Sequence, residues 1–111
     1  MPFEIVLAPE AAAAVKALIV PVRTGVTEAI ERHLRHEPKR VSKSRIKRLR
    51  GLSRPQYRLR VGDIRVFYDV AETEVQVLAI VTKAEAEAWL EEYGTPAKAS
   101  AESGGSGGSQ G

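Results

Sequence analysis

Residues 56–70, QYRLRVGDIRVFYDV, alternate between apolar and polar types on both sides of a Gly-Asp pair. Strict alternation predicts half-buried strands, and a Gly-X pair between two such runs is typical of a two-residue hairpin turn. With Gly62 and Asp63 in the turn, Arg60 lies opposite Arg65. We therefore predict a β-hairpin whose turn sets the pairing of its strands.

This register divides the side chains of the hairpin between two faces. One face carries Tyr57, Leu59, Val61, Ile64, Val66 and Tyr68. The other face carries Arg58, Arg60, Arg65 and Phe67. We interpret the first face as core, with Tyr57 and Tyr68 as cross-strand partners. Because like charges directly opposite each other destabilise a sheet, the second face needs an anionic partner or ample water.

The hairpin continues a strongly basic segment. Residues 39–65 contain eleven lysines or arginines and one acid, so this segment carries a charge of +10, although the whole chain of 111 residues carries only +3. A charge run alone is as typical of a solvated loop as of a binding surface. Because this run is continuous with the arginines of the hairpin, we favour a surface that binds a polyanion such as nucleic acid.

Composition limits the class of protein. The 111 residues, 43% of them hydrophobic, suit one globular domain with a modest core. The chain has no cysteine, and its Asp, Glu and His residues show no metal-ligand spacing, so we expect no disulfide, metal or cofactor. The longest apolar run, residues 11–22, is broken by Lys16 and Pro21 and is too short to span a membrane. Glu4 stands where a signal peptide carries positive charge, and we expect a cytoplasmic protein.

Apolar spacing and helix signals outline the other elements. We expect a strand over Phe3–Leu7, a helix from Pro9, a second helix over residues 24–38, a strand over Glu74–Thr82 and a last helix over Lys83–Gly94. The predicted fold class is α+β, with a small antiparallel-type sheet, an N-terminal helical hairpin and the order β-α-α-β-β-β-α. The domain covers residues 1–94, and residues 95–111 form a flexible Gly/Ser-rich tail that resembles a linker.

Two stretches give this arrangement a family resemblance. They are KRLRGL (Lys47–Leu52) and the pattern Y-R-L-R-x-G-D-x-R-V-x-Y (Tyr57–Tyr68). With them the chain resembles the RelE/ParE toxin superfamily over residues 3–93, on the RelE side. The resemblance implies the fold outlined above and a toxin of a type II toxin–antitoxin system. Toxins of the RelE branch cleave mRNA in the ribosomal A site, whereas those of the ParE branch poison DNA gyrase without cutting nucleic acid.

The resemblance also implies site residues. Arg58, Arg60 and Arg65 match basic positions of RelE toxins, and Lys83 takes the place of a basic residue after the last strand. We expect these four to be catalytic, because an arginine fork can hold two phosphate oxygens during RNA cleavage without a metal. For RNA binding we add Lys43, Arg45, Lys47, Arg48, Arg50 and Arg54. Trp89 could stack on a base, but a tryptophan on an amphipathic helix is more typical of a core.

The general base of the RelE pattern is missing from this chain. RelE toxins supply an arginine and a tyrosine, or a histidine, after the last strand. Here Ala84 and Leu90 occupy those positions, and Tyr93 follows nearly a turn later. His33 and His36 lie among charged residues of the second helix, and we interpret both as surface residues.

Three functions therefore stay open. The first, which we favour, is a ribosome-dependent mRNA endonuclease that inhibits translation and is held by a cognate antitoxin. The second is a non-enzymatic gyrase inhibitor of the ParE kind. The third is a catalytically weak relative that acts mainly through antitoxin binding. For the first function the partners are the ribosome, mRNA and an antitoxin whose acidic or amphipathic segment covers the hairpin arginines.

Overall fold

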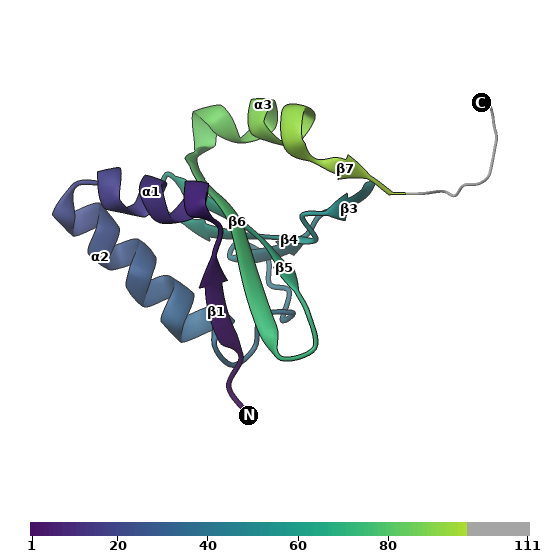
Figure 1. Ribbon diagram of the computed structural model, residues 1–111, viewed down its shortest axis with the longest axis horizontal. Coiled ribbons are helices and arrows are strands. Elements are labelled where there is room, and N and C mark those ends of the chain that lie inside the picture. The colour runs from purple at the N-terminus through teal and green to yellow at the C-terminus, as the bar shows by residue number, and fades with distance from the viewer. Residues whose placement is uncertain (98–111) are drawn as a thin grey trace.

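The computed structural model describes residues 1–97, and a five-stranded sheet lies at its centre (Figure 1). In sheet order the strands are β1 (Glu4–Leu7), β6 (Glu74–Thr82), β5 (Ile64–Val70), β4 (Tyr57–Val61) and β2 (Ile46–Arg48). β1 runs parallel to β6, and the other neighbouring strands are antiparallel. The α+β class is confirmed, with one parallel pair in a sheet that we expected to be of the antiparallel type.

Helices come before and after the strands of the hairpin. They are α1 (Pro9–Ala17), α2 (Val20–Ala29), which continues as the π-helical turn η1 (Ile30–Leu34), and α3 (Lys83–Tyr93). Pro9 and Pro21 occupy the first turns of α1 and α2, where the missing N–H has no intrahelical partner to lose. For this reason α2 begins before Pro21, earlier than predicted. Within residues 1–97 no helix has the length and apolar character that crossing a membrane requires.

The hairpin of β4 and β5 has the predicted register. Arg60 lies opposite Arg65, and Tyr57 lies opposite Tyr68. Gly62 has a φ of +58°, a left-handed conformation that glycine adopts without a steric penalty. The rings of Tyr57 and Tyr68 stack with their centroids 5.5 Å apart, and both side chains are buried. Their predicted place in the core is confirmed.

The helical hairpin of α1 and α2 covers the apolar face of the sheet. The core that they share with the strands includes Ala11, Val26, Ile30, Leu34, Leu59, Val66, Tyr68, Val75 and Val77. The hydroxyl of Tyr68, which is fully buried in this core, donates a hydrogen bond of 2.6 Å to the carbonyl oxygen of Pro38. Phe67 is buried on the opposite face, where Trp89 of α3 stacks on it. Because α1 and α2 cover the apolar face, the basic side chains of the opposite face, which α3 contacts through Trp89, are the ones that can meet a ligand.

The basic segment before the hairpin forms two short strands that the sequence did not indicate. β2 extends the main sheet at β4, and β3 (Leu52–Arg54) pairs with β7 (Thr95–Pro96) in a second, two-stranded sheet (Figure 1). Ile46 anchors β2 in the core while its two basic neighbours stay exposed. A single apolar residue among basic ones leaves no periodicity to detect. β7 lies in the segment assigned to the tail, and residues 98–111 of that tail lie outside the described part of the chain.

Candidate nucleic-acid interface

Four basic side chains gather on the sheet face opposite the helical hairpin. The register places Lys47 beside Arg58 and Arg60 beside Arg65. Because side chains alternate along a strand, all four lie on the side of Phe67, away from the core. We call Lys47, Arg58, Arg60 and Arg65 the basic face. Among residues 1–97, none of the four forms a salt bridge with an acid.

Arg58 occupies the middle of the basic face and is half-buried. Its Nε atom is inaccessible and has no hydrogen-bond partner among the described residues. Burial lowers the pKa of Arg58, and the neighbouring charges of Arg65 and Arg60 lower it further. An arginine stays protonated in proteins, so the charge persists without a partner. An unpartnered buried donor costs free energy that an anionic oxygen would recover, so this position favours binding of an anion.

Arg65 is buried and hydrogen-bonded to the backbone, which the alternating sequence pattern did not predict. Its side chain is 8% exposed, and its Nη1 donates hydrogen bonds to the carbonyl oxygens of Gly62 (2.9 Å) and Ile64 (3.1 Å). These bonds hold the guanidinium over the hairpin turn. Arg60, directly opposite, is exposed. Arg60 is therefore the reachable charge of this pair, and Arg65 is a fixed one.

Lys83 lies close to the same turn. Its backbone N–H donates a hydrogen bond of 2.8 Å to the carbonyl oxygen of Asp63. Thr82, the last residue of β6 and the one before Lys83, pairs with Ile64, the first residue of β5. The side chain of Lys83 is exposed. The structure thus brings Lys83 to the end of the hairpin that carries Arg60.

An aromatic series fastens α3 to the sheet beside the basic face. The ring centroids of Phe67 and Trp89 lie 5.3 Å apart in a stacked arrangement, and those of Trp89 and Tyr93 lie 5.4 Å apart. Phe67 is buried, Trp89 is half-buried and Tyr93 is 55% exposed. Trp89 therefore packs against the protein, as we interpreted it from the sequence.

Three of the six residues predicted to bind RNA have exposed side chains without an acidic partner within residues 1–97. Lys47 belongs to the basic face, while Lys43 and Arg50 are exposed in turns on either side of β2. Within residues 1–97 none of them has an acidic partner. These three side chains can widen the positive surface around the basic face.

Two further residues of that set have partners within the protein. Arg54 forms a salt bridge of 3.2 Å with Asp69. The guanidinium of Arg48 lies over the ring of Tyr57, 5.2 Å from its centroid, and donates a hydrogen bond of 2.8 Å to the carbonyl oxygen of Gln56. Both side chains are exposed and keep their charge, but their positions are set by these contacts.

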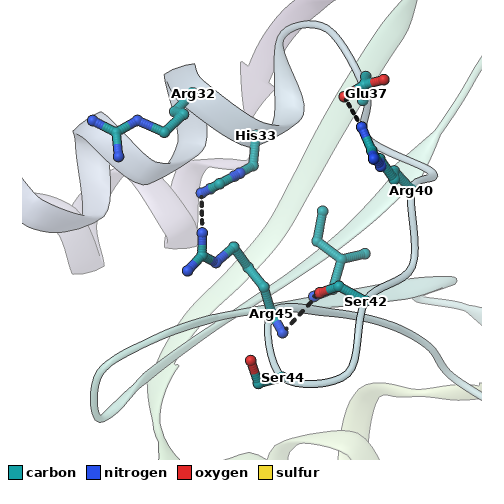
Figure 2. A pocket seen from close by; sticks show the side chains of 8 residues that line it. Arg32, His33, Glu37, Arg40, Ser42, Ser44 and Arg45 are labelled. Carbon is teal, nitrogen blue, oxygen red and sulfur yellow. Dashed lines mark hydrogen bonds and ion pairs between the residues drawn. The ribbon is translucent and has the colours of Figure 1, made fainter.

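The sixth residue, Arg45, turns toward η1. Its Nη1 lies 3.0 Å from Nε2 of His33, as Figure 2 shows. His33 is half-buried and lines a cavity of about 360 Å³ together with Arg32, Arg45 and Ser42. His33, expected at the surface, is thus partly enclosed by this cavity. Its contact with Arg45 depends on the path of residues 37–45, for which the sequence carries no periodic signal.

The basic face consists of lysine and arginine alone. It can therefore place positive charge on a phosphate, but it supplies no ordinary general base. The residues that the sequence proposed as catalytic, Arg58, Arg60, Arg65 and Lys83, lie on one side of the sheet or at its hairpin end. What the arrangement can do chemically is bind and stabilise a polyanion.

The fold matches solved toxin–antitoxin complexes. A chain of the archaeal RelE-RelB complex from Pyrococcus horikoshii OT3 superposes with a TM-score of 0.62 and 23% identity, covering 75% of this chain and 97% of that chain. A chain of the RelBE2 complex of Mycobacterium tuberculosis superposes with a TM-score of 0.61 and 24% identity, covering 74% of this chain and 99% of that chain. A chain of the RelB-RelE complex of Methanococcus jannaschii superposes with a TM-score of 0.58 and 16% identity, covering 76% of this chain and 96% of that chain.

Sequence comparison adds no closer relationship. The chain matches no protein-family model, and no curated protein is significantly similar to it. At identities below 25% a structural likeness shows the fold, and this fold is RelE-like. The fold that the sequence resemblance implied is thereby confirmed.

Proposed function

We propose that this protein is the toxin of a type II toxin–antitoxin system and that it inhibits translation by cleaving mRNA on the ribosome. The observation that carries the proposal is the positive charge of the basic face, which has no acidic partner within residues 1–97 and at whose centre the buried Nε of Arg58 has no hydrogen-bond partner among those residues. This face lies on a sheet whose fold matches chains of three RelE–RelB complexes. A phosphate backbone is the ligand that satisfies such a surface.

The proposed reaction is attack of a ribose 2′-hydroxyl on the adjacent phosphorus. The bond to the 5′-oxygen breaks, and a 2′,3′-cyclic phosphate forms. Arg58 and Arg60 stabilise the charge of the phosphorane oxygens, and the exposed ammonium of Lys83 donates a proton to the departing 5′-oxygen. The proton of the 2′-hydroxyl passes to solvent. Because the basic face offers no base, the ribosome supplies the orientation of the attacking hydroxyl, and positioning accounts for much of the rate.

The proposal includes a cognate antitoxin and a cytoplasmic site of action. The three matching chains come from complexes with RelB partners. A segment with acidic side chains would neutralise the basic face and satisfy Arg58, so we expect an acidic or amphipathic antitoxin segment over it. A complex that leaves Arg58 and Arg60 open to solvent would contradict this expectation.

The test is cleavage of a defined mRNA in a purified translation system, mapped by primer extension. We expect cuts that depend on translating ribosomes, with the same mRNA intact when ribosomes are omitted. A DNA supercoiling assay with gyrase runs in parallel. Intact mRNA with inhibited supercoiling would replace the proposal by a gyrase inhibitor. If neither activity is found, the protein acts through its antitoxin alone.

A further inference from the structure

Two adjoining cavities lie beyond the edge of the basic face, between α2 with its continuation η1 and the loop before β2. The first, of about 360 Å³, is lined by His33, Arg32 and Arg45 among others (Figure 2). The second, of about 260 Å³, shares these three residues and reaches Arg60. We propose that His33, Arg32 and Arg45 form a second anion site that binds a phosphate of the RNA backbone, next to the basic face. The choice of RNA as the ligand rests on the proposed function.

The state of His33 in the free protein follows from its contact with Arg45. A guanidinium has donors and no acceptor, so Nε2 of His33 must accept the hydrogen bond of 3.0 Å from Arg45 Nη1. The imidazole is therefore neutral, with its proton on Nδ1. Burial lowers the pKa of His33, and the charges of Arg45 and then Arg32 lower it further. Beside this neutral histidine the cavity holds the charges of Arg32 and Arg45, together with the ion pair of Arg40 and Glu37.

The acids around the cavity leave these charges available. Glu37 is engaged by Arg40 at 3.0 Å. Glu28, which lines the second cavity, forms no salt bridge with a described residue, and neither Arg32 nor Arg45 has an acidic partner within residues 1–97. An entering phosphate would meet both guanidinium groups without first displacing a carboxylate.

Binding of an anion would change the protonation of His33. A phosphate oxygen between Arg32 and Arg45 adds negative charge next to His33. His33 can then take up a proton from solvent on Nε2 and donate it in a hydrogen bond to the anion. Arg45 leaves Nε2 and turns its own donors to the same oxygen atoms. Occupation of the site is therefore linked to the uptake of one proton.

The loop that carries Arg45 is closed by its own hydrogen bonds. The hydroxyl oxygen of Ser42 accepts from the backbone N–H groups of Arg45 (3.1 Å) and Ile46 (3.3 Å), and the backbone N–H of Ser42 donates to the carbonyl oxygen of Ile46 (2.9 Å). The carbonyl oxygen of Arg45 accepts from the N–H of Arg60 (2.8 Å). These bonds tie the loop to a strand of the basic face and fix the position of the second site relative to the first.

A titration with sulfate tests the anion site without RNA. Sulfate keeps its charge between pH 5 and pH 8, so histidine signals in NMR spectra report their own protonation. We expect sulfate to raise the pKa of His33 by about one unit over a chloride solution of equal ionic strength, and to leave the exposed His36 unmoved. The variant Arg45→Gln should lose this response, whereas Lys39→Gln, at an exposed position that lines neither cavity, should keep it. Equal behaviour of His33 in sulfate and chloride would overturn the proposal.

Binding of a fluorescent single-stranded RNA then tests the assignment of the ligand. The protein should bind more tightly at pH 6 than at pH 7.5, and Arg45→Gln should weaken binding about tenfold, as expected for one charge-assisted contact. His33→Gln should remove the pH dependence, and the control His36→Gln should preserve it.

The outcomes separate this proposal from the proposed function. If His33→Gln and Arg45→Gln change neither RNA binding nor cleavage, the proposal of a second anion site is refuted. The proposed toxin function is unaffected by that result. A sulfate response at His33 in a protein that binds no RNA would refute RNA as the ligand of the cavity. The proposed endonuclease would still be decided by its own assay, ribosome-dependent cleavage of a translated mRNA.

Discussion

Arg65 folds its guanidinium back over the hairpin turn and donates a hydrogen bond of 2.9 Å to the carbonyl oxygen of Gly62, three residues before it. The same Nη1 also reaches the carbonyl oxygen of Ile64. The charge of Arg65 nevertheless stays on the basic face, directly opposite Arg60. Arg65 therefore stabilises the turn through its hydrogen bonds and also contributes positive charge to the basic face. Mutation can separate the two.

The variant Arg65→Ala should lower the free energy of unfolding by about 2 kcal/mol, because hydrogen bonds from a charged donor to two carbonyl oxygens are lost. Arg60→Ala removes the same charge from an exposed position and should change the stability by less than about 0.5 kcal/mol. Urea denaturation followed by circular dichroism measures both values. Equal losses in the two variants would show that the bonds of Arg65 to the turn contribute nothing.

Replacing Arg58, unlike replacing Arg65, should not lower the free energy of unfolding. Its buried Nε has no partner among the described residues, so Arg58→Met removes an unsatisfied donor and keeps an apolar stem of similar length. We expect the free energy of unfolding to stay the same or to rise by up to about 1 kcal/mol, although function is lost. A fall of the same size in urea denaturation would mean that Arg58 is already satisfied in the free protein.

Alkaline pH should destabilise the protein through Tyr68. Burial raises the pKa of its hydroxyl, and Tyr57 adds to the increase. An unfolded tyrosine ionises near pH ~10, so above that pH the unfolded state loses the proton first. The stability that this group contributes is fully present below the unfolded pKa and declines as the pH rises above it.

The variant Tyr68→Phe removes this titration. Near pH 7 it should cost about 1 kcal/mol, because the hydrogen bond of 2.6 Å to Pro38 is lost. Above the tyrosine pKa its stability should fall less steeply than that of the wild type. Tyr93→Phe, at an exposed position, serves as the control and should follow the wild-type curve. Parallel curves for all three proteins would contradict the role of burial at Tyr68.

Binding of single-stranded RNA should weaken as salt rises, because phosphate contacts release counterions. With three or four contacts the logarithm of the association constant should fall with the logarithm of salt concentration at a slope of about −2 to −3, and Arg60→Gln should make the slope shallower by about 0.7. Fluorescence anisotropy over a series of potassium chloride concentrations gives the slope. A flat response would argue against phosphate contacts.

The hairpin was predictable in detail because two local signals agree there. The turn at Gly62 and the alternation of Tyr57, Leu59, Val66 and Tyr68 define one register, and the structure has that register. The two strands of the basic segment were not predictable, because Ile46 is the only residue of β2 that enters the core. Its charged neighbours leave no alternating pattern in the sequence, and the strand forms because it pairs with β4.

The candidate site was predictable as a set of residues but not as a set of contacts. Alternation places Arg58, Arg60 and Arg65 on one face, yet the burial of Arg65 depends on where its long side chain finds carbonyl oxygens. In the same way, the meeting of His33 and Arg45 joins a helix to a loop twelve residues later in the chain. Such contacts follow from the course of the backbone, which local sequence patterns do not specify.

The most direct test compares cleavage of a translated mRNA by the wild type and by Arg58→Met in a purified translation system, with unfolding curves for both proteins. We predict ribosome-dependent cuts by the wild type, and their loss in a variant that is at least as stable. That result would show that the guanidinium of Arg58, whose Nε has no hydrogen-bond partner among residues 1–97, acts in cleavage. Equal cleavage by the two proteins would contradict the claim that the basic face acts on the phosphate.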